Sequence, residues 1–158
     1  MTPWAPVRGR CVTKHILMVR VRATCICSGP GFSPRTAEAQ SGLRFSRKSE
    51  PGELSEVDRY QGHAPGHGRA ELPLQEYGLF SDLTGKNSAP LDALGRSLEA
   101  LRRSGATDLR LRFDIEFAGQ CVFELSPELL KKLGELGLTL HISCFEAQET
   151  EEMSQRGH

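Results

Sequence analysis

Residues 108–146 read DLRLRFDIEFAGQCVFELSPELLKKLGELGLTLHISCFE, and this stretch decides the fold. Its first ten residues alternate apolar and charged side chains, which is the period-two pattern of a half-buried β-strand. Ala118-Gly119-Gln120 is a short turn with a glycine, and residues 121–125 predict a second strand, so the two strands predict a β-hairpin. We expect this hairpin to begin a β-β-α-β unit.

The rest of this unit is predicted by helix signals and a final strand. Ser126 is a typical N-cap residue, and Pro127 suits the first helical position. Leucines follow at helical spacing on one side, and Gly137 lies where a left-handed residue commonly ends a helix. Residues 138–144 then alternate again, which predicts a closing strand. One face of that strand carries Leu138, Leu140, Ile142 and Cys144.

The same local signals occur earlier in the chain. Residues 16–27 alternate like a strand, and the glycine-rich SGPG that follows breaks the pattern. Ser33 and Pro34 then open a short helix that is expected to run to about Ser41, and Gly42 ends it as Gly137 ends the later helix. Because strand, Ser-Pro, helix, glycine and strand recur in this order, we consider a β-α-β pseudo-repeat.

The middle of the chain supplies one more strand and one more helix. Residues 69–74 alternate but include Pro73, which favours an edge strand. Residues 91–104 carry leucines at helical spacing and end before Gly105, which predicts a third helix. Residues 46–68 are rich in glycine and charge, and we expect a long flexible loop there.

Together these patterns predict a single α+β domain of residues 18–147. We expect a two-layer sandwich, with a mainly antiparallel sheet and helices on one face in a ferredoxin-like arrangement. Residues 1–17 are predicted to be a disordered extension, with Met18 as an alternative initiator, and residues 148–158 a disordered acidic tail. The expected core is Val19, Val21, Ala23, Cys25, Leu94, Leu98, Leu101, Leu109, Leu111, Phe113, Ile115, Phe123, Leu125, Leu129, Leu133, Leu136, Leu140 and Ile142.

Charge and apolar composition limit the classes of function. The 20 lysines and arginines balance the 20 aspartates and glutamates, so no overall field favours nucleic acid or an anionic membrane. No apolar run approaches the ~18 residues of a membrane span, and the N-terminus lacks the apolar core of a signal peptide. We therefore expect a cytoplasmic protein that does not associate with membranes.

The five cysteines form no CxxC pair, which argues against a zinc-type site. Cys25, Cys27, Cys121 and Cys144 are expected to face inward from strands as reduced thiols, the usual state of core cysteines in the cytosol. A metal site or a disulfide is the alternative. His63 and His67 have i, i+4 spacing, but the prolines and glycines around them exclude the helix that would give this spacing meaning. We assign neither a metal nor a cofactor.

The chain resembles the small bacterial domain of unknown function numbered 4279. The resemblance covers roughly residues 18–146 and is carried by SGPGFSP, the Gly42-Leu43 helix end, the helix at residues 91–101 and FELSPELLKKLGELGLTLHISCFE. Members tend to have a tryptophan-containing strand where this chain has residues 69–74. The resemblance implies no activity and no catalytic residues. Some such domains lie near toxin systems, so it implies an immunity-like role only by analogy.

Arginines gather on the predicted polar face of the sheet. Arg20, Arg22, Arg110 and Arg112 are expected to project from this face, with His141 on the closing strand. Guanidinium groups hold phosphates and carboxylates through paired hydrogen bonds, so this face predicts binding of phosphate or of an acidic partner surface.

Nucleic acid is less favoured than a protein as the partner of this face. RNA-binding sheets stack bases on solvent-facing aromatic side chains, and only Phe145 qualifies here. Asp114 and Glu116 also dilute the positive charge.

The leading hypothesis is a non-catalytic protein-binding module that acts through the polar sheet face and the loop at residues 46–68. Its partner would be a protein, such as a toxin, or a second copy of the chain. The alternative is a small enzyme or ligand-binding domain that uses His141 with Asp114 or Glu116 as an acid–base pair. A third hypothesis is a homo-oligomer subunit with an exposed apolar edge along residues 70–74.

Overall fold

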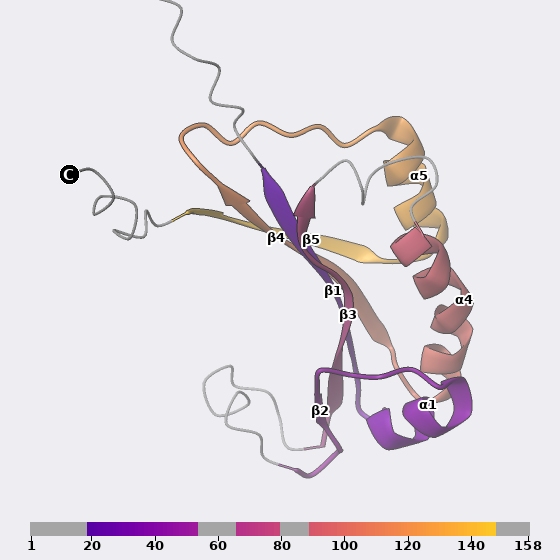
Figure 1. The fold of residues 1–158 in the computed structure, drawn as a ribbon. Helices are drawn as coiled ribbons and strands as arrows, with labels where there is room; N and C mark the ends of the chain where they lie inside the picture. Colours follow the sequence, from indigo (N-terminus) through magenta and orange to yellow (C-terminus); the bar gives the residue numbers. More distant parts are fainter. Residues whose placement is uncertain (1–18, 54–65, 80–88, 148–158) are drawn as a thin grey trace, which may run out of the picture.

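The computed structural model describes residues 19–53, 66–79 and 89–147. Within these ranges one mixed five-stranded sheet carries three helices on one of its faces, which makes an α+β fold of two layers (Figure 1). The elements in chain order are β1 (Arg20–Gly29), α1 (Pro34–Ser41), β2 (Arg47–Ser49), β3 (Gly68–Leu79), α4 (Ala89–Arg103), β4 (Asp108–Phe117), α5 (Pro127–Glu135) and β5 (Thr139–Glu146).

The strand order is β2-β3-β1-β4-β5, so β1 lies at the centre of the sheet. β1 pairs antiparallel with β3 and β4, and β3 pairs antiparallel with β2. Among the described strand pairs, only that of β4 with β5 is parallel. The sheet is therefore mainly antiparallel, as the sequence predicts, with one parallel strand at its edge.

The predicted hairpin after β4 is wrong, because residues 121–125 form no strand. The next strand along the chain is β5, which pairs with β4 in parallel, and parallel neighbours need a crossover connection rather than a tight turn. The chain therefore leaves β4, crosses to α5 in the helix layer and returns (Figure 1). Cys121, Phe123 and Leu125 pack against the core as alternate residues of an extended connection, which explains their strand-like spacing.

Both predicted Ser-Pro helix starts are confirmed. Ser33 Oγ accepts a hydrogen bond from the Thr36 amide at 3.3 Å, and Ser126 Oγ accepts one from the Leu129 amide at 3.2 Å. The two helices nevertheless connect differently placed strands. α1 leads to β2, which is separated from β1 by β3, whereas α5 leads to the immediate neighbour of β4. The repeat is therefore local and does not extend to the topology.

β3 is internal where β2 pairs with it, which corrects the prediction of an edge strand for the first part of residues 69–74. β2 pairs with only three residues of β3, from Arg69 to Glu71. Pro73 lies beyond them, beside a register shift in the pairing of β3 with β1. A proline is tolerated there because its stretch of β3 has a described partner strand on one side only.

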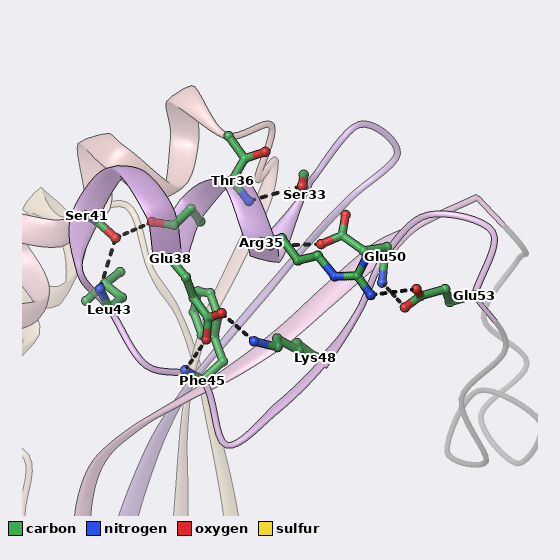
Figure 2. A network of polar contacts seen from close by, with 11 residues as sticks. Ser33, Arg35, Thr36, Glu38, Ser41, Leu43, Phe45, Lys48, Glu50 and Glu53 are labelled. Carbon is green, nitrogen blue, oxygen red and sulfur yellow. Dashed lines mark hydrogen bonds and ion pairs between the residues drawn. The ribbon is translucent and has the colours of Figure 1, made fainter.

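The described part of the predicted loop at residues 46–68 contains a short strand, because Arg47–Ser49 forms β2. Contacts from α1 hold this segment (Figure 2). The Glu38 carboxylate accepts hydrogen bonds from the Phe45 amide at 3.1 Å and from Lys48 Nζ. The hydrogen bond from Lys48, followed by that from Phe45, lowers the pKa of Glu38. The Arg35 amide donates to Glu50 Oε1 at 2.8 Å. These contacts position the short edge strand β2.

The core lies between the inner face of the sheet and the helices. Twelve of the eighteen predicted core residues are buried: Val21, Ala23, Cys25, Leu94, Leu98, Leu101, Leu109, Leu111, Phe113, Ile115, Leu129 and Leu133. The remaining six are half-buried and pack against the same clusters: Val19, Phe123, Leu125, Leu136, Leu140 and Ile142. Sequence reasoning missed Phe32, Ala37, Ala70, Leu72, Leu91 and Ala106, which are also buried.

Two of the four cysteines expected inside are not buried. Cys121 is half-buried and Cys144 is exposed. Burial falls along the inner side of β5, from the half-buried Leu140 and Ile142 to the exposed Cys144. The core therefore covers the start of β5 but not its end.

Some predictions lie outside the described residues. They are the extension at residues 1–17, the tail at residues 148–158 and residues 54–65 of the expected loop. None of the described helices has the length and apolar character that crossing a membrane would require.

Candidate functional site on the open sheet face

The candidate site lies on the sheet face that turns away from the helices (Figure 1). Val21, Ala23, Cys25 and Cys27 of β1 are buried against the helix layer, so the alternate residues of β1 point to the other side. We call this other side the open face. The same alternation in β4 puts its charged residues on the open face.

The antiparallel register of β1 and β4 separates the four predicted arginines into two pairs. Arg22 lies opposite Asp114, and Arg20 lies opposite Glu116. Arg112 instead lies opposite Thr24, and Arg110 lies opposite Ile26. The two arginine pairs therefore occupy successive parts of the open face and meet at Asp114, which both Arg22 and Arg112 contact.

The part with Arg110 and Arg112 contains a pocket of about 330 Å³, which we call the arginine pocket. It combines side chains from β1, β3, β4 and β5. His141 reaches it because the parallel register places His141 opposite Arg112. The lining residues are Ile26, Ser28, Arg69, Asp108, Arg110, Arg112 and His141. Three of the five predicted binding residues thus come together here, and Arg69 joins them from β3.

Nearby carboxylates orient the arginines of the pocket. Arg110 Nη2 lies 2.8 Å from Asp108 Oδ2, and this contact raises the pKa of Arg110. Both side chains of this ion pair are about half exposed, so the pair contributes little energy. An anionic group of a ligand could therefore replace Asp108 beside Arg110. Arg112 Nε donates to Asp114 Oδ2 at 3.2 Å, and Arg69 Nη2 lies 3.6 Å from Glu71 Oε1. The lining itself holds three arginines and one aspartate, so it suits an anion.

The other part of the open face is an aromatic cluster built around Tyr77 of β3. The guanidinium carbons of Arg20 and Arg22 lie 5.7 and 5.2 Å from the centre of the Tyr77 ring, within cation–π range. The rings of Tyr77 and Phe145 meet edge to face, with centres 6.1 Å apart. Tyr77 was missed because the predicted strand ended at residue 74, whereas β3 continues to Leu79 and its alternation places Tyr77 on the same face as Arg69.

The predicted acid–base pair does not form. Asp114 lies opposite Ser143 rather than His141, and its Oδ2 accepts hydrogen bonds from Arg22 and Arg112. Glu116 lies 3.9 Å from Arg20. In the described part of the chain, no hydrogen bond or ion pair joins His141 to either carboxylate. The carboxylates orient arginines here and do not activate the histidine.

Cys25 and Cys27 lie in the core, as predicted, with their sulfur atoms 3.9 Å apart. The contact with Cys25, together with burial, raises the pKa of Cys27, so this thiol stays protonated. His63 lies outside the described residues, and His67 is exposed. Across residues 19–53, 66–79 and 89–147, no three potential metal ligands gather in one place.

No protein-family model, curated protein or solved structure matches this chain. We therefore infer the function from the geometry of the open face.

Proposed function

We propose that this protein is a non-catalytic binding module, and that its arginine pocket holds an acidic side chain of a protein partner. The single observation that supports this most is the convergence of Arg69, Arg110 and Arg112 with His141 on one pocket of about 330 Å³. A guanidinium fork matches a carboxylate in shape and charge, and it retains its charge at every physiological pH.

The composition of the pocket supports a carboxylate on an aliphatic stem. The volume is at the lower end of the range for ligand pockets, roughly 300–1,000 Å³, and suits one side chain better than a large molecule. Ile26 offers an apolar surface for methylene groups, and Ser28 offers a hydroxyl. A glutamate or aspartate side chain uses both kinds of surface, whereas a bare phosphate uses only the polar one.

The charge of the open face also supports a protein partner. On and beside this face six described arginines meet five acidic residues, a balance of six minus five, or +1: Arg20, Arg22, Arg47, Arg69, Arg110 and Arg112 against Glu71, Glu76, Asp108, Asp114 and Glu116. Nucleic-acid sites carry a stronger basic stripe than this. Alternating charges instead suit a protein surface with complementary charges, which sets the register of docking.

The proposal also covers the location, the family, the role and the fold type of the chain. A cytoplasmic location, membership of the family numbered 4279 and an immunity-like role rest on sequence pattern. A ferredoxin-like description of the antiparallel strands β2-β3-β1-β4, with α5 and β5 added at the edge, is supported by their order. The alternative function, an enzyme based on His141 with Asp114 or Glu116, is less favoured because both carboxylates are engaged by arginines.

Affinity capture from a lysate of the native cell tests the proposal. The tagged chain should retain a protein with an exposed acidic segment, and the double variant Arg110→Glu/Arg112→Glu should lose it. The matched control, Arg96→Glu/Arg103→Glu, reverses two exposed charges on α4 in the helix layer and should retain the partner. Circular dichroism would verify that all variants are folded. Equal capture by both double variants, or recovery of RNA instead of protein, would contradict the proposal.

A further inference from the structure

β5 forms an edge of the sheet without the usual protection against pairing. Among the described residues it pairs only with β4, and its eight residues keep one regular register with that strand. The sequence TLHISCFE has no proline and no lysine, and its only carboxylate is Glu146 at the last position. Monomeric proteins commonly block such edges with lysine, proline, bulges or very short strands. β5 is therefore a template for another strand.

The opposite edge of the sheet is protected. β2 has only three residues, and two of them, Arg47 and Lys48, are charged and exposed. Lys48 is also held by Glu38 of α1. The two edges thus differ in the features that decide whether strands can pair across molecules.

Exposed apolar side chains occur on β5 and on the segments that lead to it in the chain. The described large hydrophobic residues with high exposure are Val122 (63%), Leu130 (49%) and Phe145 (40%). They come from the connection before α5, from α5 and from β5. On the inner side of β5, Leu140 and Ile142 are only half-buried. A strand added beside β5 would extend the sheet and cover apolar surface that Leu140 and Ile142 leave accessible.

We propose that the occupant of this edge is the β5 strand of a second copy of the chain, paired antiparallel about a two-fold axis through Ile142. In this register Leu140 of one copy faces Cys144 of the other on the inner side. His141 faces Ser143 on the open face. Inner residues meet inner residues and open-face residues meet open-face residues, as a continuous sheet requires. No charged residue faces a like charge.

Self-pairing at this edge produces a closed dimer. The same strand is used by both copies, so the interface is isologous and leaves no second β5 edge. The short, charged β2 edges remain at the two ends and do not propagate the assembly. The dimer has one continuous sheet of twice five strands. Because the two-fold axis is perpendicular to that sheet, both arginine pockets lie on the same side of the dimer.

Sedimentation of the full chain in reducing buffer, over a series of concentrations, tests this proposal. The expected mass is twice the 17.4 kDa of the chain. Cys144→Lys places a charge opposite Leu140 of the second copy and should weaken dimerisation about tenfold or more. Gln120→Lys, at an exposed position after β4, is the matched control and should dimerise normally. A monomer at every concentration would overturn the proposal, as would an undiminished Cys144→Lys dimer.

A pair of proline variants tests the involvement of the edge backbone. Successive residues of a strand point their amides to opposite sides, so of Ser143 and Cys144 one amide faces β4 and the other faces the free edge. Between Ser143→Pro and Cys144→Pro, one variant should therefore stay folded and become monomeric, while the other loses stability. Dimerisation by the folded variant would reject strand pairing.

Disulfide trapping tests the register. Directly opposed antiparallel residues have Cα atoms about 4.5–5.5 Å apart, which a disulfide can span. In a Cys11→Ser/Cys121→Ser/Cys144→Ser background, which leaves only the buried Cys25 and Cys27, Ile142→Cys should form a covalent dimer on oxidation, and Lys48→Cys on β2 should not. Trapping through Lys48→Cys instead would overturn the assignment to β5. The Arg110→Glu/Arg112→Glu variant should still dimerise, so this inference and the proposed function can fail separately.

Discussion

Arg22 of β1 and Asp114 of β4 lie directly opposite each other, and Arg22 Nη2 donates to Asp114 Oδ2 at 3.0 Å. The same oxygen accepts a second hydrogen bond, from Arg112 Nε at 3.2 Å. The bond to Asp114 raises the pKa of Arg22. Asp114 is only 8% exposed, so one nearly buried carboxylate joins the aromatic cluster to the arginine pocket. The open face is therefore one connected polar surface.

Removing the charge of Asp114 should destabilise the fold. Asp114→Asn leaves Arg22 and Arg112 without a carboxylate, and we expect a loss of about 1–3 kcal/mol in the free energy of unfolding. The value is moderate because the Arg22 side chain is 41% exposed and water screens it. Urea denaturation measures the change. The control Glu116→Gln removes a looser pair at 3.9 Å and should change stability by less than about 0.5 kcal/mol. Equal effects would contradict this difference.

Adding a methyl group at Gly68 should disrupt the turn that precedes α1. A Cβ atom at Gly68 would lie 1.8 Å from the backbone oxygen of Phe32. Because that oxygen is part of the main chain, the two segments must separate, and Gly68→Ala should cost about 2 kcal/mol or more.

Gly134→Ala is the matched control, since nothing lies within 4 Å of a Cβ there. Gly134 is helical, so this change should stabilise the protein by about 0.5–1 kcal/mol. Thermal unfolding that ranks the two variants in the opposite order would reject the close approach at Gly68.

The contact between Glu38 and Lys48 should make stability depend on pH in the acid range. The pKa of Glu38 is below its ordinary value of 4.5, so the folded state binds fewer protons than the unfolded state. The stabilisation is present above pH 4.5 and is lost as the pH falls through the lowered pKa. Glu38→Gln should therefore be less stable than the unchanged chain at neutral pH, and the two should converge in acid. Denaturation at several pH values measures this, and a constant difference would contradict it.

Cysteine labelling should follow exposure. Cys144 is exposed and should react with a thiol reagent in the folded, dilute protein. Cys25 and Cys27 are buried, and the raised pKa of Cys27 keeps its thiol protonated, so both should react only after unfolding. Peptide mass spectrometry after timed labelling distinguishes the sites. Rapid labelling of Cys27 in the folded protein would show that the core around β1 opens readily.

Sequence reasoning located most helices and strands because their signals are local. A cap such as Ser126 bonds an amide three residues away, and the alternation in β4 depends only on which side of one strand is buried. The hairpin at residues 121–125 failed because an extended connection that packs on a core has the same alternation as a paired strand. Pro73 indicated an edge correctly for its own stretch of β3, which has a described neighbour on one side only, but it could not show that β2 pairs with Arg69 to Glu71.

The candidate site was also predictable only where its features depend on local sequence pattern. The sequence by itself determined that Arg20, Arg22, Arg110 and Arg112 project from a polar strand face, because side chains alternate with a period of two. Only the tertiary structure decided that Arg110 and Arg112 share a pocket with Arg69 and His141, while Arg20 and Arg22 surround Tyr77. Strand order and register set these distances, and both depend on contacts between segments far apart in the chain, which no local pattern encodes.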